Sequence, residues 1–443
     1  MAAYLLFEVM VMLLSRLNDV VWSPWLLGLF LAAGLYYSLR TGFFQLFRIP
    51  LWLRTTFGAM LRRRGRGNGR GISQFQALAT ALASTIGTGS IAGVATAIWF
   101  GGPGAVFWMW VSALLGMMTG CAEKLLSVRY RRAGPAGWLG GPMYYIRDGL
   151  KSPLLAGWFA LACLPATLTG GDMVQSSSIA AALQATFGWD RLAVGAAVAV
   201  LTGLVMVGGI GRIARVSSGL VPAMALLYLG GGAAVLAARA DQIPEAMALI
   251  FCSALRPEAA VGGGMGYTLA AALRYGVARG VFTNEAGLGT SAMAHAAAEV
   301  DCPARQGMWG IVEVCVSTLL VCTSTALVIL VSGVYGPADA LVRGALGAVP
   351  PDRLGAPLTA AAFSSVLGPW GGAVVSLSLL LFAFSSILGW SWYGEQSILY
   401  LTGSRRLVPA YRLVFLSCVV LGSVWEGEAV WELVDLCNAL MAI

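Results

Sequence analysis

Two short stretches combine glycine with hydroxyl, amide and carboxyl side chains inside apolar sequence. The first is ASTIGTGSIAG, residues 83–93, and no charged residue lies between Gly71 and Ala122 around it. The second is FTNEAGLGT, residues 282–290. Glycine tolerates unusual backbone angles and lets a ligand approach the main chain closely, and oxygen atoms are the ligands that hard cations prefer. These residue types therefore favour the binding of a small ion or polar molecule.

The composition places both stretches in a membrane. Hydrophobic residues make up 58% of the chain and charged residues 11%, and the mean hydropathy is +0.79. An ordinary soluble domain has about a quarter charged residues, whereas a bilayer-spanning helix needs roughly 20 apolar residues. Uncharged runs of that length recur along the chain. We therefore expect an all-α polytopic membrane protein embedded in the lipid bilayer.

Eleven segments of the chain are candidate membrane spans. They are residues 20–39, 72–99, 104–122, 154–187, 192–211, 216–238, 266–297, 307–335, 369–394, about 411–425, and a last segment that starts near 429. Residues 242–262 have a mixed composition that indicates a surface helix and loop. The last candidate is short for a span, so we expect it to be truncated.

The basic residues indicate how the spans are oriented. Cytoplasmic loops carry an excess of Lys and Arg, and most of these residues fall on one side of the expected spans. We therefore expect a plasma (inner) membrane protein with the N-terminus outside and the loop 54–70 in the cytoplasm. The net charge of +8 follows from this asymmetry and does not indicate a nucleic-acid partner. The run RRRGRGNGR in the loop could bind anionic headgroups, but a solvated loop is the simpler interpretation.

The two glycine-rich stretches fall inside the spans 72–99 and 266–297. Backbone polar groups in hydrocarbon must be paired, so an interrupted helix persists only where it lines a cavity in the protein. Two interrupted spans with four intact spans between them are typical of an inverted-repeat transporter. Close helix packing through Gly89 and Gly93, in GxxxG spacing, is the main alternative. A phosphate-binding glycine loop is disfavoured because no strand precedes the stretch.

Six motifs resemble those of one transporter family. GISQFQALATALASTIGTGSIAGVATAIWFGGPGAVFWMW (71–110) and RGVFTNEAGLGTSAMAHAAA (279–298) look like signatures of the alanine/glycine:cation symporters, the sodium:alanine symporter family. Shorter motifs match in type and order, namely GGPMYYI (140–146), GGDMVQSSSI (170–179), FAFSSILGWSWYGE (382–395) and WELVDLCNALMAI (431–443). The resemblance implies import of alanine or glycine driven by Na⁺ as coupling ion, with no cofactor and no enzymatic activity.

The resemblance also implies the architecture. It predicts a single transmembrane transporter domain over residues 1–443 with a LeuT-like (APC-like) core of five plus five helices in inverted repeat. An extra N-terminal helix, 20–39, precedes the first repeat, 72–238. The second repeat, 266–443, is expected to be incomplete at its C-terminal end.

The site residues follow from the same resemblance. For the substrate it implies Gly87, Thr88, Gly89, Gln175, Phe282, Asn284, Ser386 and Trp390. For Na⁺ it implies the carbonyls of Ala83, Ile86 and Phe382 and the hydroxyls of Ser385 and Ser386. The first break would receive the substrate carboxylate, and the aromatic rings would limit the size of its side chain. Without the resemblance, the two serines could bond their own helix and the tryptophan could serve packing alone.

Two positions depart from the family pattern. Ser90 and Asp172 stand where the family usually has Asn. An intramembrane carboxylate is costly and indicates a functional role, so one alternative is a proton-coupled small amino-acid transporter. A transport-deficient amino-acid sensor is a separate alternative, which a truncated last span would favour. An intramembrane enzyme would need a nucleophile and a base on facing spans, and no such set stands out.

Three glutamates have simpler interpretations. We expect Glu285 to brace the second break or to pair with Arg279. Glu123 is expected to pair with Arg129, and Glu395 with Arg405, as local charge partners at the ends of spans.

Overall fold

The helices of the first half of the chain include one span with a sharp bend. The computed structural model describes residues 14, 16–18, 20–61, 71–134, 137–255, 269–336, 355–425 and 428–442. The elements up to residue 255 are α2 (Pro24–Arg40), α3 (Phe44–Phe47), α4 (Ile49–Leu61), α5 (Gln74–Thr85), the π-helix η1 (Gly89–Gly93), α6 (Val94–Gly101), α7 (Gly104–Arg129), β1 (Arg132–Gly134), β2 (Gly137–Leu139), α8 (Pro142–Gly149), α9 (Pro153–Leu168), the π-helix η2 (Thr169–Met173), α10 (Val174–Phe187), α11 (Arg191–Met206), α12 (Gly209–Ala238), the 3₁₀ turn η3 (Ala240–Gln242) and α13 (Ile243–Leu255). The segments on either side of the first glycine-rich stretch meet at 55°.

The second half contains the other interrupted span. Its elements are α14 (Leu269–Asn284), α15 (Ala292–Ala296), α16 (Pro303–Val314), the π-helix η4 (Cys315–Cys322), α17 (Thr323–Val331), α19 (Ala356–Leu367), α20 (Pro369–Thr402), the 3₁₀ turn η6 (Arg405–Leu407), α21 (Val408–Val424) and α22 (Glu428–Ala442). Within the described residues, six helices are long and apolar enough to cross a membrane, and the bent pair α5 and α6 makes a seventh.

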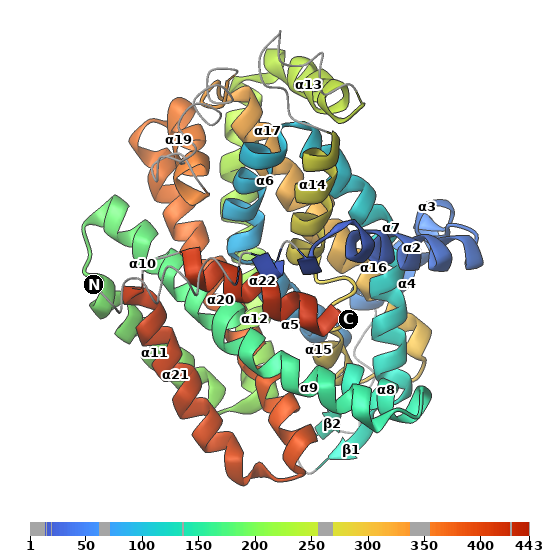
Figure 1. The fold of residues 1–443 in the computed structure, drawn as a ribbon. Coiled ribbons are helices and arrows are strands. Elements are labelled where there is room, and N and C mark those ends of the chain that lie inside the picture. Colours follow the sequence, from blue (N-terminus) through green and yellow to red (C-terminus); the bar gives the residue numbers. More distant parts are fainter. Residues whose placement is uncertain are drawn as a thin grey trace.

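The two interrupted spans lie beside each other in opposite directions. In Figure 1, α6 and α14 occupy the upper part of the view and α5 and α15 the lower part, and the contacts pair them in the same way. The segment after the first break therefore packs on the segment before the second. Ile72 and Ala298 also form a parallel bridge below α5 and α15. Both breaks consequently fall at the middle of the bundle.

Other helices surround this pair. α7 contacts α14, α15 and α16, whereas α20 contacts α5, α9, α10 and α12. α11 and α21 run side by side at the lower left of Figure 1. The breaks are thus enclosed by α7 and α16 on one side and by α10 and α20 on the other.

Local sequence explains where the key helices begin. Ser73 starts α5 with a capping box, in which its hydroxyl accepts from the Gln76 N–H and the Gln76 side chain accepts from the Ser73 N–H. This exchange satisfies two of the N–H groups that a helix start leaves unpaired. Proline at the first helical position, where no N–H is needed, begins α8, α9, α16 and α20.

A small hairpin follows α7 outside the long helices. β1 and β2 pair antiparallel, and Asp148 of α8 accepts hydrogen bonds from Arg132 and Arg147. The hydrogen bond from Arg147 is the main reason why the pKa of Asp148 is lowered from its ordinary value. This hairpin was not predicted from the sequence.

Several expected boundaries differ from the structure. The expected span 266–297 is a helix only to Asn284, followed by irregular chain and the short α15. The expected span 154–187 is interrupted by η2. Of the loop 54–70, residues 54–61 are helical in α4, and residues 62–70 lie outside the described residues. The region 242–262 contains α13, as a surface helix was expected there, and its end also lies outside the described residues.

Candidate functional site

The first break lies between Thr85 and Gly89 and requires glycine at its centre. A Cβ atom on Gly87 would lie 2.5 Å from the Ser386 Oγ and 3.0 Å from the Gln175 Oε1. A Cβ on Gly89 would lie 2.9 Å from the Phe282 ring. Side chains from α10, α14 and α20 therefore approach the main chain here more closely than any other residue type would permit.

Gln175 connects the first break to η2. Its Nε2 donates to the Gly170 carbonyl at 3.1 Å, and its Oε1 accepts from the Thr88 N–H at 3.3 Å. The π-helix η2 displaces the chain just before this residue, and such bulges are frequent at functional sites. The amide thereby holds the break against α10 with neutral groups only.

A cluster of buried oxygens lies beside the same break. The Ser385 Oγ is 3.0 Å from the Ala83 carbonyl oxygen and 2.8 Å from that of Phe382, and the Ser386 Oγ is 3.1 Å from the Ala83 carbonyl oxygen. Ile86 ends α5 with a ψ of 85°. Carbonyl and hydroxyl oxygens without carboxylates suit a hard monovalent cation. No group of His, Cys, Asp and Glu able to hold a metal ion occurs among the described residues.

The second break, residues 285–291, is held mainly by carboxyl groups. The Glu123 Oε1 of α7 accepts from the N–H groups of Gly287 at 2.9 Å and Gly289 at 3.1 Å. The Thr290 hydroxyl donates to the Glu285 Oε2 at 2.5 Å. Glu285 itself has a φ of 54°, in the left-handed region that non-glycine residues rarely adopt. Glutamate is therefore held in a strained backbone position.

α7 contacts the chain of the second break at regular intervals. Glu123 bonds the N–H groups, the Ser127 hydroxyl donates to the Ala292 carbonyl at 2.7 Å, and the Arg131 guanidinium donates to the Ala296 carbonyl at 3.1 Å. Residues four apart share one face of a helix. Glu123 and Ser127, on one face of α7, thus support the break and the start of α15, and Arg131, just beyond the end of α7, holds the end of α15.

A buried charge cluster continues from this face. The Lys124 Nζ lies 3.6 Å from the Glu123 Oε2 and 3.4 Å from the Glu313 Oε2, and the His295 Nε2 lies 3.2 Å from the same Glu313 oxygen. The Thr85 hydroxyl donates to the Glu313 Oε1 at 3.2 Å and links the cluster to the first break. Lys124, Glu313 and His295 are fully buried.

Two charge partners expected from the sequence are wrong, and the structure favours one of the two alternatives expected for Glu285. Glu123 pairs with Lys124 instead of Arg129. Glu285 braces the second break through the hydrogen bond from the Thr290 hydroxyl, which is one of the two expected alternatives, and the Arg279 guanidinium forms an ion pair with Asp435 of α22 at 3.4 Å. Glu395 is hydrogen-bonded by Arg412 at 2.6 Å instead of by Arg405. Lys124 is the neighbour of Glu123 in α7, whereas Asp435 and Arg412 lie on other helices than Arg279 and Glu395, so tertiary packing decides which of these charges meet.

A small cavity of about 20 Å³ lies between the two breaks. Its lining residues are Ser84, Thr85, Gly87, Gly89, Gly170, Gln175, Phe282, Glu285, Leu288, Trp390 and Asn438. This volume accommodates about one water molecule. Residues from both breaks and from α9–α10, α20 and α22 thus converge on one enclosed polar space.

The structure brings most of the predicted substrate residues to this cavity. Gly87, Gly89, Gln175, Phe282 and Trp390 line it, and Thr88 and Ser386 bond residues that line it. Asn284 does not line it: its Oδ1 accepts from the Ala286 N–H at 3.0 Å, and its amide faces Gly116 of α7. Sequence reasoning missed Thr85, Leu288 and Asn438 and gave Glu285 no place in the site.

The two departures from the family pattern lie apart from the cavity. Asp172 is fully buried in η2, and neither carboxylate oxygen has a hydrogen-bond partner among the described residues. η2 packs on α21, whose Tyr411 and Cys418 lie within range of its charge. Ser90 is also buried, and its carbonyl accepts from the Thr325 hydroxyl at 2.9 Å.

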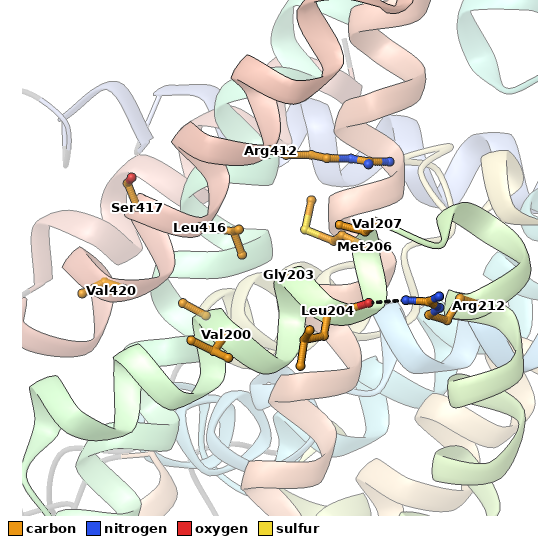
Figure 2. A pocket seen from close by; sticks show the side chains of 11 residues that line it. Val200, Gly203, Leu204, Met206, Val207, Arg212, Arg412, Leu416, Ser417 and Val420 are labelled. Atoms are coloured by element: carbon orange, nitrogen blue, oxygen red, sulfur yellow. Dashed lines mark hydrogen bonds between the residues drawn. The ribbon is translucent and has the colours of Figure 1, made fainter.

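A larger groove of about 580 Å³ lies between α11 and α21. Figure 2 shows its mainly apolar wall, with Val200, Leu204 and Leu416 on facing helices and the Arg212 guanidinium bonded to the Leu204 carbonyl. Val200 and Leu204 are more than half exposed, as expected for lipid-facing side chains. None of the predicted site residues lines this groove, so size alone does not identify the functional site.

A polytopic bundle with two glycine-mediated breaks around a polar cavity defines a membrane transporter. Similarity to known proteins supports this class and gives the family. The chain belongs to the sodium:alanine symporter family, whose sequence profile matches residues 7–443. This is a family of transporters and not of enzymes.

Two relatives and one solved structure illustrate the similarity. The chain is 40% identical to the sodium/alanine symporter AgcS of Methanococcus maripaludis, over 98% of this chain and 92% of the relative. It is 36% identical to the putative sodium/proton-dependent alanine carrier protein YrbD of Bacillus subtilis, over 95% of this chain and 86% of the relative. Its fold resembles that of a Na⁺-coupled sialic acid symporter, with a TM-score of 0.51 at 12% identity over 94% of this chain and 82% of that one.

Proposed function

We propose that the protein is a secondary active symporter that imports a small neutral amino acid, alanine or glycine, together with Na⁺ by alternating access. The observation that carries the proposal is the cavity lined from both helix breaks. A broken helix offers N–H groups to an anionic substrate group and carbonyl groups to a cation. The relative named a sodium/alanine symporter supports the choice of substrate and ion.

In this proposal the substrate carboxylate binds at Gly87, Thr88 and Gly89, with Gln175 beside it. Gln175 already accepts from the Thr88 N–H, so substrate binding exchanges one hydrogen bond for another. The Phe282 and Trp390 rings leave room for no more than a small side chain. Because the cavity is about 20 Å³, the described conformation must open locally before alanine enters.

The proposed Na⁺ site consists of the carbonyls of Ala83, Ile86 and Phe382 and the hydroxyls of Ser385 and Ser386. This site adjoins the substrate site, because the Ser386 hydroxyl lies against Gly87. A cation that orders these oxygens also orders the first break. Na⁺ binding would therefore prepare the carboxylate subsite, which is the coupling that a symporter needs.

The architecture proposed for this mechanism is a five-plus-five inverted repeat in a single domain, with residues 72–238 and 266–443 as the repeats and 20–39 as the extra helix. The opposite directions of the two broken spans support it. We also propose an outside N-terminus and a cytoplasmic loop 54–70. A zwitterion carried with one Na⁺ moves one net charge, for which 100 mV supplies roughly 2.3 kcal/mol.

Uptake of labelled alanine into proteoliposomes tests the proposal. We expect accumulation with an inward Na⁺ gradient and none with an equal K⁺ gradient. The variant Ser386→Ala should reduce the response to Na⁺. Saturable alanine binding without accumulation under any gradient would contradict transport and identify an amino-acid sensor.

A proton-coupled transporter is the second candidate, favoured by Asp172. Its carboxyl group is fully buried and has no hydrogen-bond partner among the described residues, so a proton would relieve the cost of the charge. One relative carries a name that includes proton dependence. Comparing uptake driven by H⁺ gradients in wild type and Asp172→Asn tests this candidate, and identical profiles would exclude it.

A further inference from the structure

Glu285 differs chemically from the other described residues that line the cavity between the breaks. Among the described lining residues it is the only one with an ionisable side chain. The residue is 2% exposed. Within the described part of the chain, its only hydrogen-bond donor is the Thr290 hydroxyl, which donates to the Glu285 Oε2. The carboxyl group therefore faces the cavity with hydrogen-bonding capacity left on Oε1.

The buried groups around Glu285 include more carboxyl groups than cationic ones. Three buried carboxyl groups, Glu123, Glu285 and Glu313, lie near one ammonium, Lys124, and one imidazole, His295. Lys124 and His295 lie within ion-pair distance of Glu123 and Glu313. A buried carboxylate is strongly penalised unless a cation or several donors meet it. Among the described residues, Glu285 is the carboxyl group of this set without an ion-pair partner at contact distance, although the Lys124 ammonium lies close enough to act on its charge.

The opposite wall of the cavity has the complementary property. The first break presents the main chain around Gly87 and Gly89 together with the Gln175 amide, and no carboxylate lines that wall. An α-amino acid zwitterion has its two charges on neighbouring groups, so one cavity can hold both. The carboxyl group on one wall therefore suits the ammonium group of such a molecule, and the main chain of the first break on the other wall suits its carboxylate.

We propose that Glu285 is the amine subsite, whose carboxylate binds the α-ammonium group of the transported substrate. This inference rests on the proposed function and specifies its substrate class as zwitterionic α-amino acids, as opposed to small carboxylic or hydroxy acids. The substrate supplies the direct ion-pair partner that Glu285 does not have among the described residues. The Thr290 hydrogen bond and the left-handed backbone at Glu285 keep the carboxylate directed into the cavity.

Competition binding of labelled alanine to the purified full-length protein in Na⁺ tests the inference. The competitors are unlabelled alanine and lactate, which has a hydroxyl group in place of the ammonium group. In wild type we expect a strong preference for alanine. In Glu285→Gln we expect alanine affinity to fall roughly 10- to 100-fold, the loss of a charge-assisted hydrogen bond, and the preference over lactate to fall toward one.

Two further variants distinguish recognition from bracing. Thr290→Val removes the brace but keeps the carboxylate, so the preference for alanine over lactate should persist. Glu285→Asp keeps the charge on a shorter side chain, so it should retain the preference at lower affinity and serves if Glu285→Gln does not fold.

Several results would overturn the inference. One is unchanged alanine affinity in Glu285→Gln, and another is an unchanged alanine-to-lactate ratio. A change confined to the Na⁺ dependence would assign Glu285 to the cation instead. If wild type binds no alanine, the proposed function fails as well, which separates that failure from an error about Glu285 alone.

Discussion

The two helix breaks face the same cavity but are supported in different ways. The first break and η1 bond neutral side chains from four helices: Gln175 of α10, Thr325 of α17, Thr359 of α19 and Ser386 of α20. The second break bonds Glu123 of α7, and its neighbourhood contains Lys124 and Glu313. The first break is thus supported mostly by neutral side chains, and the second break is supported mostly by charged ones.

This difference assigns distinct tasks to the breaks. The N–H groups of Gly287 and Gly289 already bond Glu123, so they cannot receive a substrate carboxylate without breaking a charge-assisted bond. The Gln175 amide and the Thr88 N–H at the first break form a neutral hydrogen bond, and such a bond has a net contribution of about 1 kcal/mol. We therefore expect the second break to move with α7 as one unit while the first break exchanges partners during transport.

The largest expected effect comes from breaking the charge cluster. Lys124→Met leaves Glu123 and Glu313 without their ammonium partner, which costs about 3–5 kcal/mol when one member of a buried ion pair is removed. We expect a large drop in the unfolding temperature of the detergent-purified protein. The control is Lys151→Met at an exposed lysine. Equal unfolding temperatures for the two variants would contradict the proposed rigidity of the second break.

Gly87→Ala tests the close packing of the first break. Its Cβ would lie 2.5 Å from the Ser386 Oγ, whereas a Cβ on Gly93 would have its nearest neighbour at 4.0 Å. We expect Gly87→Ala to cost about 1–3 kcal/mol through overpacking and to weaken Na⁺-dependent alanine binding at least tenfold, as titration would measure. Gly93→Ala is the matched control. If both variants lose binding equally, helix packing through the GxxxG spacing explains the glycines better.

Ser385→Ala tests the neutral support of the first break. The hydroxyl lies near the Ala83 and Phe382 carbonyls, and its loss should cost about 1 kcal/mol. We expect a roughly fivefold weaker dependence of alanine uptake on Na⁺, with little change in unfolding temperature. Ser391→Ala removes an equally buried hydroxyl of α20 that bonds the Leu388 carbonyl of its own helix. A Na⁺ dependence that shifts equally in both variants would exclude a specific role for Ser385.

The sequence predicted the breaks better than their supports. Glycines that interrupt an apolar span are visible in the local sequence, so the interruptions at 83–93 and 282–290 could be located from residue type alone. The convergence of Gln175 and Trp390 on the first break came only from the family resemblance. The burial of the Lys124 charge could not be predicted from local sequence, because its partner Glu313 is far along the chain. The four-residue spacing of Glu123 and Ser127 was a local signal that could have revealed the supporting face of α7.

The smallest expected effect on the unfolding temperature concerns surface charges near the C-terminal end of α7. Asp148 bonds Arg132 of the hairpin, which follows Arg131, the residue that caps the chain after α15. Because the pKa of Asp148 is lowered in the folded protein, the stability that this carboxylate contributes is fully present above its unfolded pKa of about 3.9. That stability is lost as the pH falls through the lower pKa of the folded state. Because Arg132 is mostly exposed, the pair contributes about 0–1 kcal/mol. Asp148→Asn should therefore lower the unfolding temperature slightly at pH 7 and not at all near pH 2. A decrease in unfolding temperature at pH 7 as large as that of Lys124→Met would show that surface charges support the second break as strongly as the buried cluster does. The support of the second break would then have to include the hairpin.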